Sequence, residues 1–516
     1  MKTRRLWSFS GGLKLPGHKN PSTPMPIVQA ALPKRLVLPL QQHIGEAAEP
    51  MVSIGDQVLK GQVIATAQGY LSAPVHASSS GQVVALENRP IPHPSGLSAP
   101  CIVIETDGKD AWGERHPVEN YQQIDPSHLR NLIRQAGIVG LGGAGFPTFI
   151  KLNPGPQPKV KTLILNGAEC EPYITCDEAL MRERAEEIIQ GAAIMAHALN
   201  AYHCLIGIED DKPEAYTVLA AAAAAEGIEV VPIPTRYPAG GEKQLIKVLT
   251  GQEVPSNGLP IDIGVVCHNV GTAAAVYRAI HRGEPLLSRI MTVAGKAVAH
   301  PGNLEVLLGT PIRHLLAQQG ANIQSIDRLI MGGPMMGFTL HDDGAPVIKT
   351  TNCLLAGIHE DTRQPPAMPC IRCGACVEAC PVGLLPQQLY WHARAKELDK
   401  TQDYHLFDCI ECGCCAYVCP SHIPLVQYYR YAKSEIWTQE QEREKADLAR
   451  QRHEFRQQRL AREQQQKAAR QRARKAPVTP SASKAEKQAA IQAAVERSQA
   501  KRAAQKTAED EPFSSP

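Results

Sequence analysis

Two copies of one cysteine pattern constrain this chain more than any other feature. The segments "CIRCGACVEACP" and "CIECGCCAYVCP" begin at Cys370 and Cys409, and each reads C-x2-C-x2-C-x3-C-P. Their first and last cysteines are offset by the same 39 residues, so one unit has been duplicated. Three thiolates at three-residue steps can curl a short loop around one iron–sulfur cube, and the proline then directs the chain away. The spacing therefore predicts two [4Fe–4S] clusters.

The fourth cysteine of each copy decides how the ligands are shared. In bacterial ferredoxins with this run it binds the other cluster. The two predicted ligand sets are Cys370, Cys373, Cys376 and Cys419 for one cluster, and Cys380, Cys409, Cys412 and Cys415 for the other. Cys414 has no place in the pattern and is predicted not to be a ligand. The alternative is a pair of structural zinc sites, but zinc usually takes two C-x2-C pairs with a long spacer, and neither copy has that form.

Composition limits the other functions open to the chain. Its 516 residues are too many for one core and suggest three to five domains. A net charge of +3 and an aromatic content of 5% argue against a nucleic-acid partner. Nine of the 15 cysteines lie between Cys370 and Cys419, which points to metal or redox work in a reducing compartment. Because residues 1–19 lack an apolar signal region and no apolar run is long enough for a bilayer, we expect a cytosolic chain, or one bound to a membrane through partners.

A glycine-rich loop precedes the cysteines. Asp125 and Pro126 have the character of a helix start, and residues 140–145 then match G-x-G-x-x-G. A dinucleotide fingerprint requires a strand before the glycines, whereas a helix is expected here. The loop offers unobstructed backbone N–H groups followed by Phe146 and Lys151, and could hold a phosphate or a flat ring system. A bare turn without a ligand is the alternative.

Strands and helices alternate after this loop. We expect strands at "TLIL", "CLIGIED", "IEVVPI" and "DIGVVCHNVGT", and a helix over residues 177–199. Three more helices are expected, one through the alanine run at residues 220–225, one at "GEKQLIKVLTG" and one at "AAAVYRAIHRG". Such alternation predicts a parallel sheet covered by helices, with ligands at the carboxyl ends of the strands. The phrases "NGAECEP", "YPAGGEK" and "HNVGT" all fall at strand ends or helix starts, where a cofactor would bind. Cys170, Cys176, Cys204, Cys267 and Cys353 are interpreted as small buried hydrophobic residues.

The phrases "GLGGAGFPTFIKL", "NGAECEPYITCDE" and "CPSHIPLVQYYR" closely resemble the RnfC family over roughly residues 30–432. That family is the electron-input subunit of the Rnf (Rsx) ion-translocating oxidoreductases of bacterial membranes. The resemblance implies a subunit on the cytoplasmic side of the inner membrane, with integral membrane subunits and an iron–sulfur subunit as partners. It also implies that NADH gives a hydride to FMN and that two [4Fe–4S] clusters relay single electrons.

The central region is in turn similar to the FMN- and NADH-binding subunit of respiratory complex I. No catalytic side chain is implied, because FMN carries the hydride chemistry. By similarity, Lys151 and the loop glycines would cradle FMN and Phe146 would stack near the nicotinamide or adenine. The full set is Gly142, Gly143, Gly145, Phe146, Lys151, Asn166, Glu169, Tyr237, Glu242, Asn269 and Thr272. Four positions depart from the relative's motifs and would weaken bonds to the flavin: Leu141, Ala168, Gly241 and Gly271.

Several of these residues could instead have purely structural roles. Phe146 and Tyr237 could be core aromatics, and Glu169 and Glu242 could be helix-start carboxylates. Two rival functions also remain, namely a soluble flavin/iron–sulfur reductase resembling cobalamin reductase, and a flavin-free electron-wire and docking subunit.

The fold expected overall is a multidomain α/β protein. Residues 1–30 are an N-terminal segment, and residues 31–110 resemble a lipoyl-type barrel-sandwich. Because no lysine is present at the tip, where such domains carry their prosthetic group, we expect this module to be a scaffold and docking module. Residues 120–285 form the parallel-sheet flavin core, residues 286–350 resemble the SLBB β-grasp domain, and residues 360–432 form the helical two-cluster domain. From residue 433 the chain is a charged tail, expected as a solvated helix followed by disorder through "APVTPSASK". The segment "IPLVQYYRYAKSEIW" is expected to pack on a partner subunit.

Overall fold

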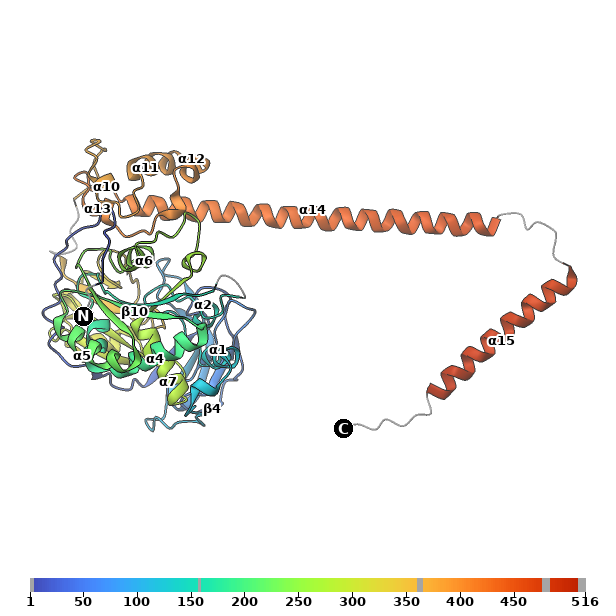
Figure 1. The fold of residues 1–516 in the computed structure, drawn as a ribbon, viewed down its shortest axis with the longest axis horizontal. Coiled ribbons are helices and arrows are strands. Elements are labelled where there is room, and N and C mark those ends of the chain that lie inside the picture. The colour runs from blue at the N-terminus through green and yellow to red at the C-terminus, as the bar shows by residue number, and fades with distance from the viewer. Residues whose placement is uncertain (1–3, 156–158, 360–364, 476–482, 509–516) are drawn as a thin grey trace. The chain divides into compact units, whose positions relative to one another are not determined.

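The computed structural model describes residues 4–155, 159–359, 365–475 and 483–508 (Figure 1). The chain forms two compact units, residues 1–436 and 437–516. Every residue predicted to bind a cofactor or a cluster lies in the first unit. Among the described residues, no helix combines the length and the apolar character that crossing a membrane would need.

A four-stranded parallel sheet forms the centre of the first unit, in the order β11-β10-β9-β12. Its strands are β9 (Thr162–Gly167), β10 (His203–Glu209), β11 (Glu229–Ile233) and β12 (Val265–Asn269). Five helices accompany it: α3 (Cys176–Glu183), α4 (Ala185–Leu199), α5 (Pro213–Ala223), α6 (Glu242–Thr250) and α7 (Val270–His281). These elements confirm the predicted parallel sheet.

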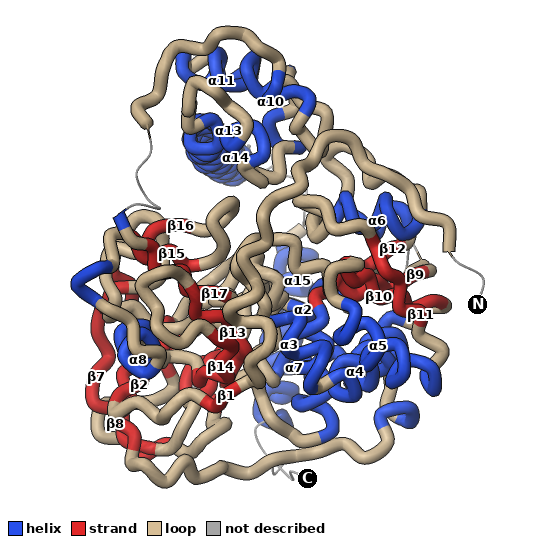
Figure 2. The backbone as a smooth tube through the Cα atoms, turned by 90° about the vertical axis from the view of Figure 1, so that its left-hand side faces the viewer, coloured by secondary structure: helices blue, strands red, loops and turns tan. Residues whose placement is uncertain are grey.

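Both faces of this sheet are buried, which explains the continuous apolar character of its strands. Leu163 and Leu165 pack on the side of α4, α5 and α7, whereas Ile164 packs on the side of α6. Figure 2 shows α6 on one face of the sheet and α4, α5 and α7 on the other. Because β9 and β12 run parallel, their carboxyl ends lie at the same edge of the sheet. The start of α6 lies beside this edge, since Asn166 bonds to the Gly240 carbonyl.

The helix predicted over residues 177–199 is two helices, so that prediction was wrong in its length. Arg184 separates α3 from α4 with φ −136° and ψ 37°. Its guanidinium pairs with Glu305 on a neighbouring sheet, with 2.6 Å between Nη2 and Oε2. The helix thus breaks at the residue that pairs with Glu305, which is far away in the sequence, and local helix propensity does not predict such a break.

The glycine loop follows a helix, as predicted. Helix α1 (Pro126–Gln135) begins where the Asp125 carboxylate accepts a bond from the N–H of Ser127, at 2.8 Å. The loop then closes on itself, since the N–H of Gly140 donates to the Phe146 carbonyl at 2.8 Å. The short helix α2 (Thr148–Lys151) comes next.

The N-terminal β-rich module consists of two small sheets, in the orders β2-β8-β7-β4 and β3-β5-β6. The strands are β2 (Arg35–Pro39), β3 (Glu49–Pro50), β4 (Gln57–Val58), β5 (Val63–Thr66), β6 (Val75–His76), β7 (Gly81–Pro90) and β8 (Ser98–Thr106). Leu36, Ile64 and Ile104 are fully buried and continuous with the core of the α/β region.

A six-stranded mixed sheet has the order β1-β14-β13-β17-β15-β16. The strands are β1 (Val28–Gln29), β13 (Ser288–Ala294), β14 (Gly302–Leu307), β15 (Arg328–Met331), β16 (Phe338–Thr339) and β17 (Cys353–Gly357), with α8 (Ile312–Gln318) beside them. The edge strand β1 comes from the N-terminal segment and pairs in parallel with β14.

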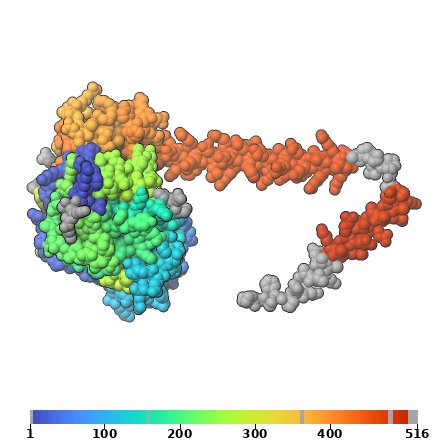
Figure 3. Space-filling model, viewed as in Figure 1, coloured from blue at the N-terminus to red at the C-terminus, as the bar shows by residue number. Residues whose placement is uncertain are grey.

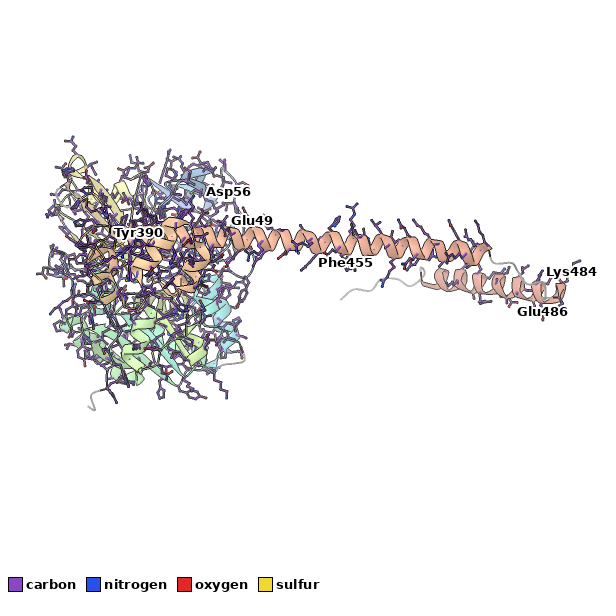
Figure 4. All side chains as sticks on the ribbon, turned by 90° about the horizontal axis from the view of Figure 1, so that it is seen from above. Glu49, Asp56, Tyr390, Phe455, Lys484 and Glu486 are labelled. Carbon is purple, nitrogen blue, oxygen red and sulfur yellow. The ribbon has the colours of Figure 1, made fainter. Side chains whose placement is uncertain are left out.

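The cysteine region is helical, as predicted. Two short helices, α10 (Ala375–Glu378) and α13 (Cys414–Tyr417), follow left-handed glycines at Gly374 and Gly413. Longer helices complete the domain: α11 (Pro386–Ala395), α12 (Leu398–Asp403) and the start of α14 (Leu425–Lys475). Tyr390 on α11 contacts Tyr428 on α14 edge-on, with 4.8 Å between ring centroids (Figure 4).

The segment predicted to pack on a partner also completes this domain's own core. Leu425, Val426, Tyr429 and Ile436 on α14 are all buried against α11 and the cysteine loops. The apolar face of α14 therefore finds partners within the chain, while Tyr431 in the same segment is 39% exposed. Packing of the segment on a partner subunit stays a prediction.

The second unit contains the rest of α14 and α15 (Lys484–Ala508). Its described side chains are almost all exposed, including Phe455 at 73% (Figure 4). The solvated helix expected here is confirmed, and α15 was not predicted. Residues 476–482, within the expected disordered segment, lie outside the described residues.

We predict that Gly191→Ala destabilises the core. A methyl group at Gly191 on α4 would lie 1.9 Å from the Ala273 carbonyl oxygen on α7. Overpacking of this kind typically costs about 1–3 kcal/mol, whereas Gly→Ala in an open helix stabilises by about 1 kcal/mol. The measurement is urea unfolding followed by circular dichroism. Gly113→Ala is the control, since its added methyl would meet nothing closer than 3.5 Å. Equal midpoints for the two variants would contradict the close contact of α4 and α7.

Candidate cofactor and cluster sites

The glycine loop is held from behind and open in front. The N–H of Leu141 donates to Thr272 Oγ1 at 3.0 Å, and the Leu141 carbonyl accepts from Arg289 Nη2 at 3.1 Å. Gly142 and Gly143 are exposed. A methyl group at Gly142 would lie 3.4 Å from the Asn269 side chain, so the loop passes close to the start of α7. The buried side of the loop is fixed by hydrogen bonds, while its exposed glycines leave the backbone accessible.

Asn269 organises the start of α7 next to this loop. Its Oδ1 accepts from the N–H of Gly271 at 2.8 Å, which caps the helix, and its Nδ2 donates to Asp177 Oδ2 at 2.6 Å. Glu169 accepts from the N–H groups of Asp177 and Glu178 at 2.6 and 3.1 Å. Burial and the neighbouring Glu169 carboxylate raise the pKa of Asp177. Glu169 therefore serves as a carboxylate at the start of α3.

Lys151 reaches the carboxyl end of the sheet. Its Nζ donates to Glu242 Oε1 and to the Cys267 carbonyl, both at 2.6 Å. The side chains of Lys151 and Glu242 are 30% and 40% exposed. Asn166 at the end of β9 donates from Nδ2 to the Gly240 carbonyl at 2.8 Å. The structure thus brings Lys151, Asn166 and the start of α6 together, although they are far apart in the sequence.

These residues fit a flavin phosphate and ring in their chemistry. The exposed loop glycines can donate backbone N–H groups, and Lys151 offers an ammonium group. Three buried polar atoms have no hydrogen-bond partner among the described residues: Thr148 Oγ1, Gln244 Oε1 and His268 Nε2. Thr148 and Gln244 are close in sequence to Lys151 and Glu242, and the charge of Lys151 acts on His268. Gly145 has φ +64°, and a methyl group there would lie 2.6 Å from Thr350, so the turn requires glycine. Phe146 is half-buried beside the loop.

A cavity of about 570 Å³ lies on the buried side of the glycine loop. Leu141, Asp177, Gly271 and Arg289 line it from the core side, and Trp112 lines it from the N-terminal module. Arg289 is 5% exposed and also donates from Nη1 to the Lys349 carbonyl, at 2.5 Å. Sequence reasoning missed Arg289 and Asp177, which position the loop and α7 through contacts that no motif contains.

The cysteines gather into two sets, each lining its own cavity. The distal site is defined by Cys370, Cys373, Cys376 and Cys419, which line a cavity of about 240 Å³. The proximal site is defined by Cys380, Cys409, Cys412 and Cys415, which line a second cavity. These are the two sets expected from the exchanged fourth cysteine. Four thiols on one cavity form the donor set of an iron–sulfur cube.

Burial distinguishes the two sites. Cys373 of the distal site is exposed, whereas Cys412 and Cys415 of the proximal site are 7% and 8% exposed. Cys414 is fully buried with Tyr237, Ala379 and Cys412 and is absent from the described lining of both cavities. A hydrogen bond with Cys412 and burial raise the pKa of Cys414. This placement accords with the prediction that Cys414 is not a ligand.

Tyr237 joins the core to the proximal site. Its side chain is 3% exposed, and its hydroxyl donates to the Cys412 carbonyl at 2.7 Å. The resemblance to the complex I subunit implies Tyr237 beside the flavin, and that role stays a prediction. In the structure its hydroxyl group is committed to the cluster loop.

Two further contacts seal this junction. Glu171 accepts from the N–H groups of Met335 and Met336 at 3.2 and 2.8 Å, and burial raises its pKa to about 7. The Met335 carbonyl in turn lies 3.0 Å from where a methyl group at Gly413 would be. The phrase "ECEP" contains Glu171, but the resemblance points to the neighbouring Glu169 as the site residue.

The N-terminal segment covers the other side of the junction. Gly12 donates to the Ala379 carbonyl at 3.0 Å, and Leu13 exchanges two backbone bonds with Tyr237 at 2.7 and 2.8 Å. Gly11 has φ +57°, and a methyl group there would lie 2.3 Å from the Cys380 carbonyl oxygen. In Figure 3 the dark blue N-terminal segment reaches the orange cluster domain. No motif in residues 1–30 indicated this contact.

Four family models match the chain in the expected order. The RnfC barrel sandwich hybrid domain matches residues 7–109, and the Nuo51 FMN-binding domain matches residues 133–278. The SLBB domain matches residues 290–339, and the 4Fe-4S dicluster domain matches residues 369–423. The predicted series of domain types is confirmed.

Similar proteins are named as the same subunit of an ion-translocating oxidoreductase complex. The subunit from Pseudomonas aeruginosa is 52% identical over 90% of this chain and 60% of its own length. The corresponding subunit from Pectobacterium atrosepticum is 48% identical over 97% of this chain and 72% of its own length. A solved NAD+-reducing [NiFe]-hydrogenase in the H2-reduced state is 18% identical over 62% of this chain and 63% of its own, with a TM-score of 0.44.

The chain spans about 60% of the length of the first of these relatives. The match to the Pectobacterium protein covers more than two thirds of both chains. Together with the barrel-sandwich match, it establishes the predicted resemblance. The chain belongs to the RnfC family, whose members are subunits of ion-translocating oxidoreductase complexes.

Proposed function

We propose that this chain is the electron-input subunit of a membrane-bound ion-translocating complex. It takes a hydride from NADH at a bound FMN and passes single electrons through two [4Fe–4S] clusters to a partner subunit. FMN, when bound, supplies the conversion between two-electron hydride chemistry and one-electron chemistry. The observation that carries the proposal is the buried proximal site, whose Cys412 loop is hydrogen-bonded directly to the domain of the glycine loop.

The core residues would bind and orient FMN rather than transfer protons themselves. The exposed N–H groups of Gly142 and Gly143 would donate to its phosphate, with Lys151 supplying positive charge. Thr272 would keep the loop in place through its bond to Leu141, and Asn269 would keep α7 capped beside it. Asn166 and Glu242 lie where the sheet edge meets α6, and would complete the site.

The order of the two clusters follows from burial. The proximal site packs against the core, so electrons would enter there. The distal site has the exposed ligand Cys373 and a rim that includes Ile371, which is 68% exposed. Electrons would therefore leave from the distal site, because a partner protein can approach its ligand loop closely.

The relatives' names support the assignment to a complex. Proteins about 50% identical to this chain are named as subunits of ion-translocating oxidoreductase complexes. We infer that this chain binds the other subunits of such a complex, including integral membrane subunits and an iron–sulfur subunit. It would then be held on the cytoplasmic side of the inner membrane by those partners.

The cluster assignment predicts iron contents. The chain, with its clusters reconstituted anaerobically, should contain about eight irons, from two four-iron clusters. Cys373→Ser should reduce this to about four by removing a distal ligand. Cys414→Ser should keep about eight, because Cys414 is buried outside both ligand sets. The measurement is iron and sulfide analysis with electron paramagnetic resonance (EPR) spectra of the reduced protein. Loss of a cluster in Cys414→Ser would contradict the ligand sets.

The flavin site predicts a binding defect in Lys151→Gln. Removing a charged hydrogen-bond donor should weaken FMN affinity about tenfold to hundredfold, since such bonds contribute about 1.5–3 kcal/mol. The measurement is quenching of FMN fluorescence on titration with the chain. Lys247→Gln is the matched control, because Lys247 is a surface lysine on α6 paired with Glu253.

Two outcomes would count against the flavin site. Equal affinities for the Lys151 and Lys247 variants would remove Lys151 from it. If the unmutated chain does not bind FMN, the flavin-free electron wire would replace the proposal.

A further inference from the structure

A seven-residue segment connects the candidate flavin residues to the proximal site. Residues 236–242 lie in the connection between β11 and α6, and the last of them, Glu242, is the first residue of α6. At one end, Glu242 pairs with Lys151 at 2.6 Å, and the Gly240 carbonyl accepts from Asn166 at 2.8 Å. At the other end, the Tyr237 hydroxyl donates to the Cys412 carbonyl at 2.7 Å. One short piece of backbone therefore touches both sites.

The hydroxyl bond of Tyr237 is made in a dry environment. Tyr237 is 3% exposed and packs with Ala379, Cys412 and Cys414. A carbonyl oxygen can only accept, so the Tyr237 hydroxyl is the donor of this bond. Backbone bonds with Leu13 on its other side fix the position of the residue. A hydrogen bond shielded from water is stronger electrostatically than an exposed one.

A donor at this position acts on the cluster through its ligand residue. The O–H dipole directs its positive end towards the carbonyl of Cys412, one of the proximal thiolate ligands. Reduction adds negative charge to a cluster, and hydrogen bonds and burial around the ligands tune its potential. A positive dipole end held nearby favours the reduced state and raises the potential.

We propose that Tyr237 is a positioning residue for electron transfer, which holds the Cys412 loop against the core and raises the reduction potential of the proximal cluster. This inference rests on the proposed function, because it requires a cluster at the proximal site. It assigns Tyr237 to the cluster side of the junction, rather than to the flavin or to packing alone.

The test is a redox titration of the full chain followed by EPR. Tyr237→Phe keeps the ring and removes only the hydroxyl. We expect the reduction potential of the proximal cluster to become more negative. The shift should correspond to a threefold to tenfold change in the ratio of reduced to oxidised cluster at a fixed potential, and a tenfold change is about 59 mV for a one-electron couple. The distal potential should not move. Cys373→Ser, which retains the proximal cluster, identifies which EPR signal belongs to which site.

Thr401→Val is the matched control for the loss of a buried hydroxyl in the cluster domain. Thr401 is fully buried and donates to the Leu398 carbonyl at 2.6 Å, and it is absent from the described lining of both cavities. Neither potential should shift in this variant. A shift there as large as in Tyr237→Phe would show that loosening of the domain, and not the Cys412 bond, changes the potential.

The remaining outcomes separate the inference from the proposed function. If the unmutated chain forms both clusters and Tyr237→Phe leaves the proximal potential unchanged, the inference is overturned and the proposed function stands. If both potentials shift equally, the effect is not local to Cys412 and the inference is again overturned. If the unmutated chain forms no proximal cluster, the proposed function fails and the inference fails with it.

Discussion

The buried contact between the Cys412 loop and the α/β core is the interaction on which the rest of this structure depends. A carrier of single electrons is useful only if it is close to its donor and shielded from water, so the loop that holds the proximal site must pack against the domain that holds the flavin. Tyr237 reaches Cys412 from the core side. Glu171 secures the Met335 turn, and the N-terminal segment lies along Ala379 and Cys380. Three distant parts of the chain therefore converge on the two cysteine loops that form the proximal site.

The α/β core provides the other half of this arrangement. Its parallel sheet places the ends of β9 and β12 beside the start of α6, and this is why Lys151, Asn166 and Glu242 meet. The glycine loop comes from before the sheet, and the Leu141–Thr272 bond fixes it to α7. Because the loop is anchored through its buried residue, Gly142 and Gly143 can remain exposed. Two of the positions that differ from the complex I motifs, Leu141 and Gly271, lie on this anchored side. The backbone of Leu141 bonds to Thr272 and Arg289, and the N–H of Gly271 bonds to Asn269.

The sequence predicted the features that depend on local spacing. Cysteines at fixed intervals must meet a cluster of fixed size, and the two cavities contain the two expected sets. The alternation of strands and helices predicted the parallel sheet, and Asp125 with Pro126 predicted the start of α1. Features set by distant partners were not predicted. The break at Arg184 accompanies an ion pair with Glu305, and the apolar face of α14 packs on the cluster domain itself. The role of residues 11–13 has no signal beyond two adjacent glycines.

We propose that this chain alone accepts electrons from NADH and distributes them to its clusters. The most direct measurement is the visible spectrum of the anaerobic chain, with FMN bound and clusters reconstituted, before and after addition of NADH. We expect the flavin band to bleach first and the broad iron–sulfur absorption to follow. If dithionite bleaches the clusters while NADH changes neither band, the core has no hydride site and the chain is an electron wire.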